Sequence, residues 1–163
     1  MPKRRKRKTV RQQYLSAGPL PTRLAGQFDD HRLIFSDASQ KRQGGLAAVL
    51  FADPDSLPVI ATRSVPLVGS NELELQAVLF ALEVARKHFP GEPTALFSDN
   101  RDAVDRLGRA RENGLNADPE LADMLLQLNM DALPATTHFF WIRSHATCLG
   151  NALADFHAGQ AAG

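Results

Sequence analysis

Short apolar runs separated by turn residues open the patterned part of the chain. Three such runs, rich in aliphatic and aromatic side chains, predict buried strands at residues 31–36 (HRLIFS), 44–52 (GGLAAVLFA) and 59–65. The turns between them are short enough for each strand to pair with the one before it. We therefore expect an antiparallel meander at the start of the fold.

Helical and strand patterns alternate after the meander. The first helix opens with an Asn-x-x-Glu capping pattern at Asn71 and Glu74, and Asp118 followed by Pro119 is typical of the start of another helix. The order βββαβααβα predicts an α/β fold, a five-stranded mixed sheet flanked by helices. The elements expected after the meander are a helix at 71–88, a strand at 94–97, helices at 101–111 and from 119 to about 130, a strand at 136–142 and a helix at 151–160.

Charge separates the chain into two parts. Residues 1–28 show no sustained periodicity and are expected to form a flexible basic arm and linker, with the folded domain at 29–163. Eight of the 19 Lys and Arg residues precede the first acid, Asp29, so 11 remain against all 18 acids and the rest carries −7. Such an arm suits a polyanion, although it could also be a nuclear address or a solubility tail. The unbroken basic run is Lys3, Arg4, Arg5, Lys6, Arg7 and Lys8.

Several classes of protein do not fit the sequence. No apolar run approaches the roughly 18 to 20 residues that span a bilayer, and no apolar segment follows the basic N-terminus, so we expect no membrane span and no secretory signal. The single cysteine, Cys148, cannot form an internal disulfide or a cysteine-rich zinc site and is expected to be an inert thiol. A monomeric cytoplasmic protein is expected, or a nuclear one if the arm is an address.

Four acids occupy positions that suggest chemistry. Asp37 and Asp99 each follow a predicted strand, so both would reach one edge of the sheet if those strands are parallel neighbours. Glu74 shares an apolar helix face with Val78, whereas Glu72 lies on a solvated face. Asp155 lies in a largely apolar part of the last helix. Taken singly, each could instead cap a turn or helix, or be a solvated helix residue.

Carboxylates gathered at one site repel one another unless divalent cations share them. Hard oxygen ligands favour Mg²⁺ or Mn²⁺ over zinc. Two such ions can activate a water and stabilise the leaving oxygen in phosphodiester cleavage.

The motifs LIFSDASQ, GGLAAVL, NELELQAVLFALE, ALFSDN and WIRSHATCLGNALADFHAG resemble, in this order, the successive motifs of type 1 ribonucleases H. The resemblance covers residues 31–158, nearly all of the predicted domain. It implies the ribonuclease H-like fold and an endonuclease that hydrolyses the RNA strand of RNA/DNA hybrids. The products would carry 5′-phosphate and 3′-hydroxyl ends, and two Mg²⁺ ions, or Mn²⁺ in their place, would act as cofactors.

The resemblance also assigns roles to single residues. It implies that Asp37 bridges the two ions, that Asp155 completes one site, and that Glu74 and Asp99 complete the other. His145 matches a mobile histidine that is thought to aid proton handling or product departure.

Other matching positions have two interpretations. Asn71 matches a position that contacts the hybrid, and a plain N-cap role is the alternative. Asn151 matches a residue of the last motif and could also cap its helix. Trp141 is expected to be a core residue rather than a base-stacking one. Residues 118–133 contain no Lys or Arg, so the family's basic protrusion is expected to be absent, and the loop after Asp37 is shorter than in many cellular members.

Two other functions compete with this hypothesis. A DNA-directed nuclease of the same superfamily, resolvase-like or transposase-like, would share the acidic cluster, but the motif around His145 argues against it. A nucleic-acid-binding module without catalysis is disfavoured because all four acids are present.

Overall fold

The computed structural model describes residues 19–143 and 148–163. Within these described residues, nine helices and strands longer than a single turn follow one another in the predicted order βββαβααβα. They are β1 (Arg32–Gln40), β2 (Gly44–Phe51), β3 (Val59–Val65), α1 (Ser70–His88), β4 (Thr94–Ser98), α2 (Arg101–Asn113), α3 (Pro119–Gln127), β5 (Thr137–Trp141) and α4 (Leu149–Ala162).

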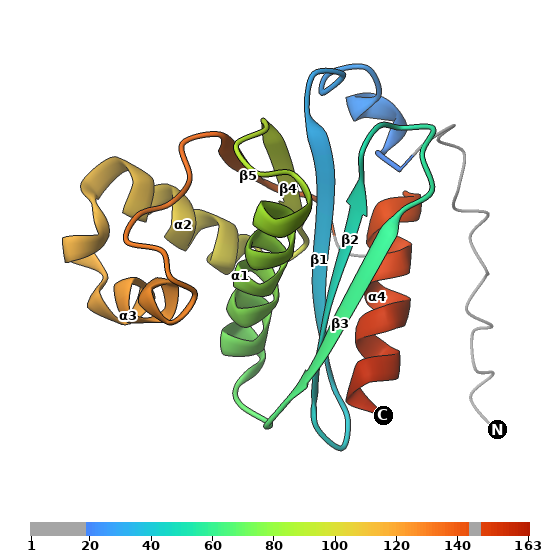
Figure 1. The fold of residues 1–163 in the computed structure, drawn as a ribbon. Coiled ribbons are helices and arrows are strands. Elements are labelled where there is room, and N and C mark those ends of the chain that lie inside the picture. The colour runs from blue at the N-terminus through green and yellow to red at the C-terminus, as the bar shows by residue number, and fades with distance from the viewer. Residues whose placement is uncertain (1–18, 144–147) are drawn as a thin grey trace, which may run out of the picture.

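A five-stranded mixed sheet forms the middle of the molecule (Figure 1). Its strand order is β3-β2-β1-β4-β5, with β2 antiparallel to β1 and β3, and with β4 parallel to both β1 and β5. The antiparallel half is the predicted meander, joined by short turns. The parallel half needs longer crossovers, which contain α1 before β4 and α2 with α3 before β5. The central strand β1 joins the two halves.

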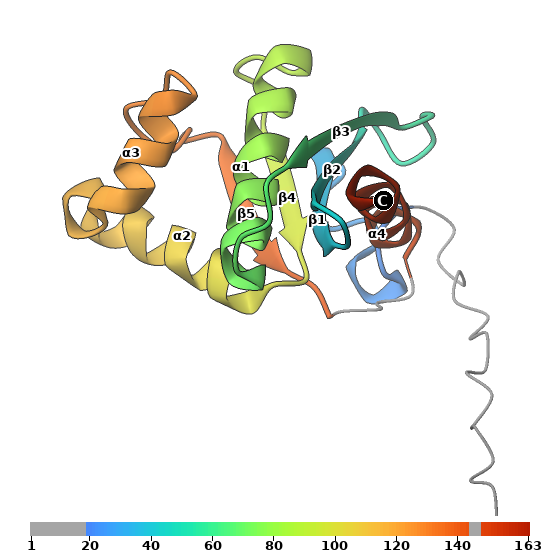
Figure 2. The same cartoon turned by 90° about the horizontal axis from the view of Figure 1, so that it is seen from below.

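Helices cover both faces of this sheet (Figure 2). One hydrophobic core lies on the side of α1, α2 and α3 and includes Ile34, and the other lies on the side of α4 and includes Phe35. Successive residues of β1 thus enter opposite cores, as the pleat of a strand requires. Because α1 and α4 both contact β2, that strand is buried over its whole length, whereas the edge strand β3 is largely exposed. No helix of the described residues is long and apolar enough to cross a membrane.

The predicted elements are confirmed in kind and order, and their ends differ by a few residues. The capping role of Asp118 is confirmed, since its side chain accepts a hydrogen bond from the backbone N–H of Leu121 at 3.2 Å. Helix α3 ends at Gln127, earlier than predicted, because Asn129 takes a left-handed conformation with φ 59°. A left-handed residue ends helical hydrogen bonding.

Residues 19–28, which were expected to belong to the linker, pack against the folded domain. Leu20 is 6% exposed and belongs to the core on the α4 side. The backbone oxygen of Pro19 accepts a hydrogen bond from Gly150 of α4 at 3.1 Å. Phe28 packs edge-to-face on Phe97, with ring centroids 5.4 Å apart. These few apolar side chains anchor the segment, although it shows no periodicity in the sequence. Residues 1–18, which include the basic run, lie outside the described residues.

Candidate active site

The pairing of β1 with β4 brings two predicted carboxylates together. The strands are parallel, and Phe35 of β1 lies beside Phe97 of β4. Asp37 and Asp99 each follow by two residues, so both lie at the same end of the sheet, as expected. Asp37 does not follow its strand, however: β1 continues to Gln40 because its pairing with β2 continues to the turn. Asp99 directly follows β4.

Glu74 completes a cluster of three carboxylates. It lies near the start of α1, and carboxylate oxygens of Asp37, Glu74 and Asp99 lie within 4.8 Å of one another. Asp37 is only 4% exposed, and the other two side chains are half-buried. Glu72 is exposed. The helical pattern therefore predicted correctly which of the two glutamates faces inward.

Crowding and burial make it unfavourable for this cluster to carry its full negative charge. Burial, followed by the charges of Asp99 and Glu74, raises the pKa of Asp37 to about 9, although its Oδ1 accepts a hydrogen bond from the backbone N–H of Ala38 at 2.9 Å. Burial and the charge of Asp99 raise the pKa of Glu74 to about 7. The Oε2 atom of Glu74 is buried and has no hydrogen-bond partner among the described residues. A cation among these oxygens would relieve both the repulsion and the unpaired acceptor.

Helix α4 packs closely on β1 and β2 because glycines line its contact. A Cβ atom at Gly45 of β2 would overlap the backbone oxygen of Ala158, and one at Gly150 of α4 would overlap the ring of Phe35. The side chains that these positions lack would push the helix away from the sheet.

This close packing brings Asp155 of α4 near the cluster from the other face of the sheet. Asp155 is exposed and is not among the three carboxylates that lie within 4.8 Å of one another. Its negative charge nevertheless contributes to the raised pKa of both Asp37 and Glu74. Asp155 is thus the outermost of the four predicted acids.

The donor atoms fit a divalent hard cation. Asp37, Glu74 and Asp99 offer carboxylate oxygens at mutual distances that one ion could share, and Asp155 could add a fourth carboxylate. Oxygen ligands without nitrogen or sulfur favour Mg²⁺ or Mn²⁺ over zinc.

Asn71 does not cap α1, so the predicted capping pattern is wrong. The N-cap is Gly69, which makes no side-chain cap hydrogen bond, and Asn71 lies inside the first turn. Its Oδ1 accepts a hydrogen bond from Nδ2 of Asn100 at 3.2 Å, and its Nδ2 donates to Asp102 at 3.5 Å. Asn71 is exposed beside the helix turn that carries Glu74, and its contact with a hybrid stays a prediction.

Asn100 is a residue of the site region that the sequence analysis missed. It is the N-cap of α2, since its Oδ1 accepts a hydrogen bond from the backbone N–H of Ala103 at 2.8 Å. Its own N–H donates to Oγ of Ser98 at 3.1 Å. These bonds hold the turn that carries Asp99. An Asn directly before a predicted helix at 101 was the available signal.

Two further predictions concern the last motif. His145 lies outside the described residues. Asn151 is described, and it does not cap α4, because the N-cap is Cys148. Asn151 is 4% exposed. Burial raises the pKa of the Cys148 thiol, as expected for an inert cysteine.

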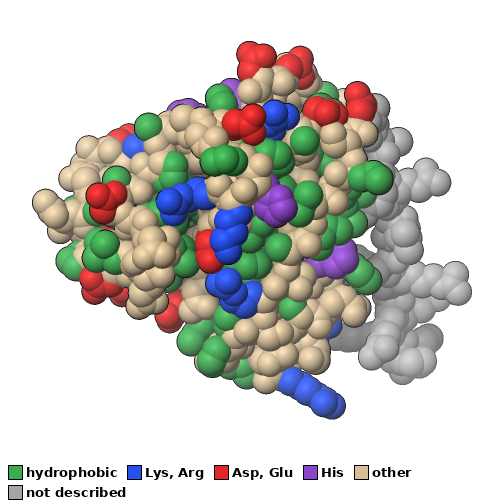
Figure 3. Space-filling view, in the orientation of Figure 1, with side chains coloured by type: hydrophobic (Ala, Val, Ile, Leu, Met, Phe, Trp, Pro, Cys, Tyr) green, Lys and Arg blue, Asp and Glu red, His purple; other side chains and the backbone are tan. Residues whose placement is uncertain are grey.

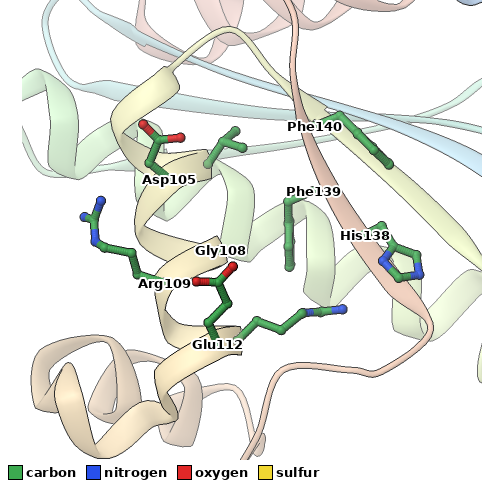
Figure 4. Close-up of a pocket in the computed structure, with 9 residues that line it drawn as sticks. Asp105, Gly108, Arg109, Glu112, His138, Phe139 and Phe140 are labelled. Atoms are coloured by element: carbon green, nitrogen blue, oxygen red, sulfur yellow. The ribbon is translucent and has the colours of Figure 1, made fainter.

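A separate groove of about 500 Å³ lies between α2 and β5 (Figure 4). Arg109 and Glu112 line it from α2, and His138 and Phe139 line it from β5. It contains none of the four predicted acids, and its charged side chains are of both signs. The groove is therefore distinct from the carboxylate cluster.

Solved structures share this fold. LC11-RNase H1, isolated from compost and crystallised with an RNA/DNA hybrid, is 15% identical, with a TM-score of 0.58 over 79% of this chain and 94% of that chain. RNase H1 from the halophilic archaeon Halobacterium salinarum is 17% identical, with a TM-score of 0.59 over 80% and 96% of the two chains. The N-terminal RNase H domain of rv2228c from Mycobacterium tuberculosis is 17% identical, with a TM-score of 0.61 over 81% and 93%.

No curated protein matches the sequence. The family model for RNase H matches residues 29–163, which is most of the chain and contains all four acids. The chain therefore belongs to the RNase H family of ribonucleases.

Proposed function

We propose that the protein hydrolyses the RNA strand of RNA/DNA hybrids and leaves 5′-phosphate and 3′-hydroxyl ends. One observation carries the proposal: three carboxylates lie within 4.8 Å of one another at the sheet end in a chain of the RNase H family. The structure of LC11-RNase H1 with a bound hybrid supports the choice of substrate.

The four acids have distinct places in this proposal. Asp37 is the most buried and feels the charges of the other three, so it is the natural ligand to be shared by two cations. Glu74 and Asp99 would bind on one side of it, and Asp155 on the other. When bound, two Mg²⁺ or Mn²⁺ ions would supply an activated water and stabilisation of the leaving oxygen.

Two polar residues are proposed to act beside the acids. Asn71 presents an exposed amide next to the turn of Glu74, where it could donate to or accept from the hybrid. His145 is proposed to handle a proton or to help the product leave.

The experiment compares cleavage of an RNA/DNA hybrid, duplex DNA and single-stranded RNA, with Mg²⁺ and with a strong chelator. We expect the protein to cleave only the RNA strand of the hybrid, and to do so with Mg²⁺ but not with the chelator. The Asp99→Asn variant should not cleave the hybrid. End analysis should find 5′-phosphates. Cleavage of duplex DNA would favour the DNA-directed nuclease, and binding of the hybrid without cleavage would favour a binding module.

A further inference from the structure

Trp141, the only tryptophan of the chain, contacts the turn that carries Asp99. It is the last residue of β5 and lies beside Ser98, the last residue of β4. Its indole Nε1 donates a hydrogen bond to the backbone oxygen of Asp99 at 3.0 Å. The contact therefore joins the end of one parallel strand to the first residue beyond the other.

This hydrogen bond lies just beyond the end of β4, where the backbone no longer forms hydrogen bonds within the sheet. The last bond of the ladder runs from the N–H of Ile142 to the oxygen of Ser98 at 2.9 Å. The next carbonyl, that of Asp99, lies beyond β4 and is held by the indole instead. Because this bond fixes the peptide plane after Asp99, it limits rotation about the backbone that carries the carboxylate.

The indole itself is held in place by a stacked cation. The guanidinium carbon of Arg101 lies 4.1 Å from the centre of the Trp141 ring. Trp141 is half-buried, so one ring face meets Arg101 while the N–H edge points to Asp99. Cation–π stacking of this kind favours one orientation of the ring.

We propose that Trp141 is a positioning residue for the metal centre: its N–H orients Asp99 so that this carboxylate faces Asp37 and Glu74 and completes the site of a divalent cation. This inference rests on the proposed function, because it concerns the same four acids. It predicts that the hydrogen bond, rather than the bulk of the ring, sets the affinity for the cation.

Trp141→Phe tests the inference, since it keeps an aromatic ring under Arg101 and removes only the donor and part of the bulk. Loss of a partner that orients a metal ligand weakens affinity by roughly 10-fold or more. We therefore expect Mn²⁺ affinity, measured by calorimetry without substrate, to fall by about 10-fold. The Mg²⁺ concentration for half-maximal hybrid cleavage should rise by a similar factor, and saturating Mg²⁺ should restore most of the rate.

Phe139→Leu is the matched control. Phe139 lies two residues earlier on β5, on the same side of the strand, with the guanidinium of Arg111 5.6 Å from its ring centre. Phe139→Leu removes an aromatic ring and its contact with Arg111, a larger change in packing than Trp141→Phe makes, but it leaves the bond to Asp99. We expect its Mn²⁺ affinity to equal that of the wild type, with melting curves showing that both variants fold.

Equal Mn²⁺ affinity in Trp141→Phe and the wild type would overturn the inference. So would an equal loss in Phe139→Leu, which would indicate a general packing effect. If Trp141→Phe does not fold, the wild type still provides a test. Mn²⁺ should quench the fluorescence of its single tryptophan, and the Mn²⁺ concentration at half-maximal quenching should agree with the affinity found by calorimetry. The Asp37→Asn variant should show no such quenching. Absence of quenching would contradict the inference. A wild type that binds Mn²⁺ without cleaving hybrid would reject the proposed function alone.

Discussion

Asp37 shows how a single residue can favour function over stability. Its carboxylate is buried beside those of Glu74 and Asp99, and its pKa of about 9 lies far above the ordinary value of 3.8. A neutral side chain at this position would not suffer that repulsion. The chain keeps an ionisable group there, and an ionisable group whose pKa is shifted this far is typical of a functional site.

Asp37→Asn should therefore stabilise the metal-free protein while abolishing hybrid cleavage. Because the folded state holds a proton that the unfolded chain has lost, wild-type stability falls as pH rises from 3.8 to about 9. The stability of the variant does not fall with pH in this way, because its asparagine does not ionise. At pH 8 its melting temperature should therefore be higher by at least roughly 2–4 °C, which corresponds to about 1 kcal/mol in the free energy of unfolding. The difference should shrink towards pH 4. Calorimetry in chelator measures it, and a lower melting temperature of the variant at pH 8 would contradict the electrostatic explanation.

Glu72 and Glu74 provide a paired test on one helix turn. Glu74→Gln removes a charge from the carboxylate cluster, so we expect hybrid cleavage to fall by roughly 100-fold or more. Glu72→Gln removes the same charge from an exposed position and should leave cleavage nearly unchanged. Cleavage rates at saturating Mg²⁺ measure both. The reverse result would mean that the other glutamate binds the metal.

The inward direction of the Glu74 side chain was predictable, because the spacing of apolar residues along a helix shows which face is buried. The role of Asn71 was not predictable. Its Asn-x-x-Glu pattern also fits a capping box, which would start the helix two residues later than the observed N-cap. The structure places the N-cap at Gly69, and the Asn71 amide then meets Asn100 of another helix's cap. A contact between segments so distant in the chain leaves no local pattern.

At the scale of elements, the contact between α4 and the sheet decides where Asp155 lies. Gly45 has no side chain to separate the two elements, so the backbone of α4 lies directly against β2. The helix was predictable from its composition. The distance of this helix from the sheet was not predictable, because hydrophobic periodicity does not show which glycine faces which backbone atom. The buried anchor at Leu20 was missed for the same reason, since a single apolar residue makes no pattern.

Gly45→Ala tests this packing. Its new Cβ would meet backbone atoms of Ala158, which cannot rotate away, so α4 must shift. Overpacking of this kind destabilises by about 1–3 kcal/mol. We expect a lower free energy of unfolding in denaturant and slower hybrid cleavage, because Asp155 moves away from the cluster.

Gly108→Ala is the control for that variant. Gly108 lies inside α2 and is exposed, and a Cβ atom there would meet no neighbouring element within 4 Å. Alanine there should stabilise by about 0.5–1 kcal/mol, because it restricts the unfolded chain and favours the helix. Equal stability changes in the two variants would show that the glycine contact with α4 does not matter.

At the scale of the whole molecule, the net charge of the domain opposes binding of the proposed substrate. Residues 29–163 carry a net charge of −7, from 11 basic and 18 acidic residues, while the proposed substrate is a polyanion. On the face shown in Figure 3, Lys and Arg side chains of the described residues lie in the middle with acidic side chains nearby, and one basic side chain lies apart at the lower edge. Several basic side chains of the described residues form ion pairs with acids, such as Arg63 with Glu83 at 3.3 Å and Arg106 with Asp118 at 2.6 Å.

The basic run from Lys3 to Lys8 holds six cations with no acid between them, and we propose that it binds phosphates of the hybrid beyond the active site. If four of its cations contact phosphates, deletion of residues 1–11 should flatten the slope of log K against log salt by roughly 3 to 4, at about 0.7 to 0.9 per contact. Replacing the six residues by Gln should have the same effect, since charge rather than length releases the counterions. The rate of cleavage in the bound complex should hardly change. Hybrid binding measured at several salt concentrations, in Ca²⁺ to suppress cleavage, decides the matter: identical slopes with and without the arm would leave it an address or a solubility tail.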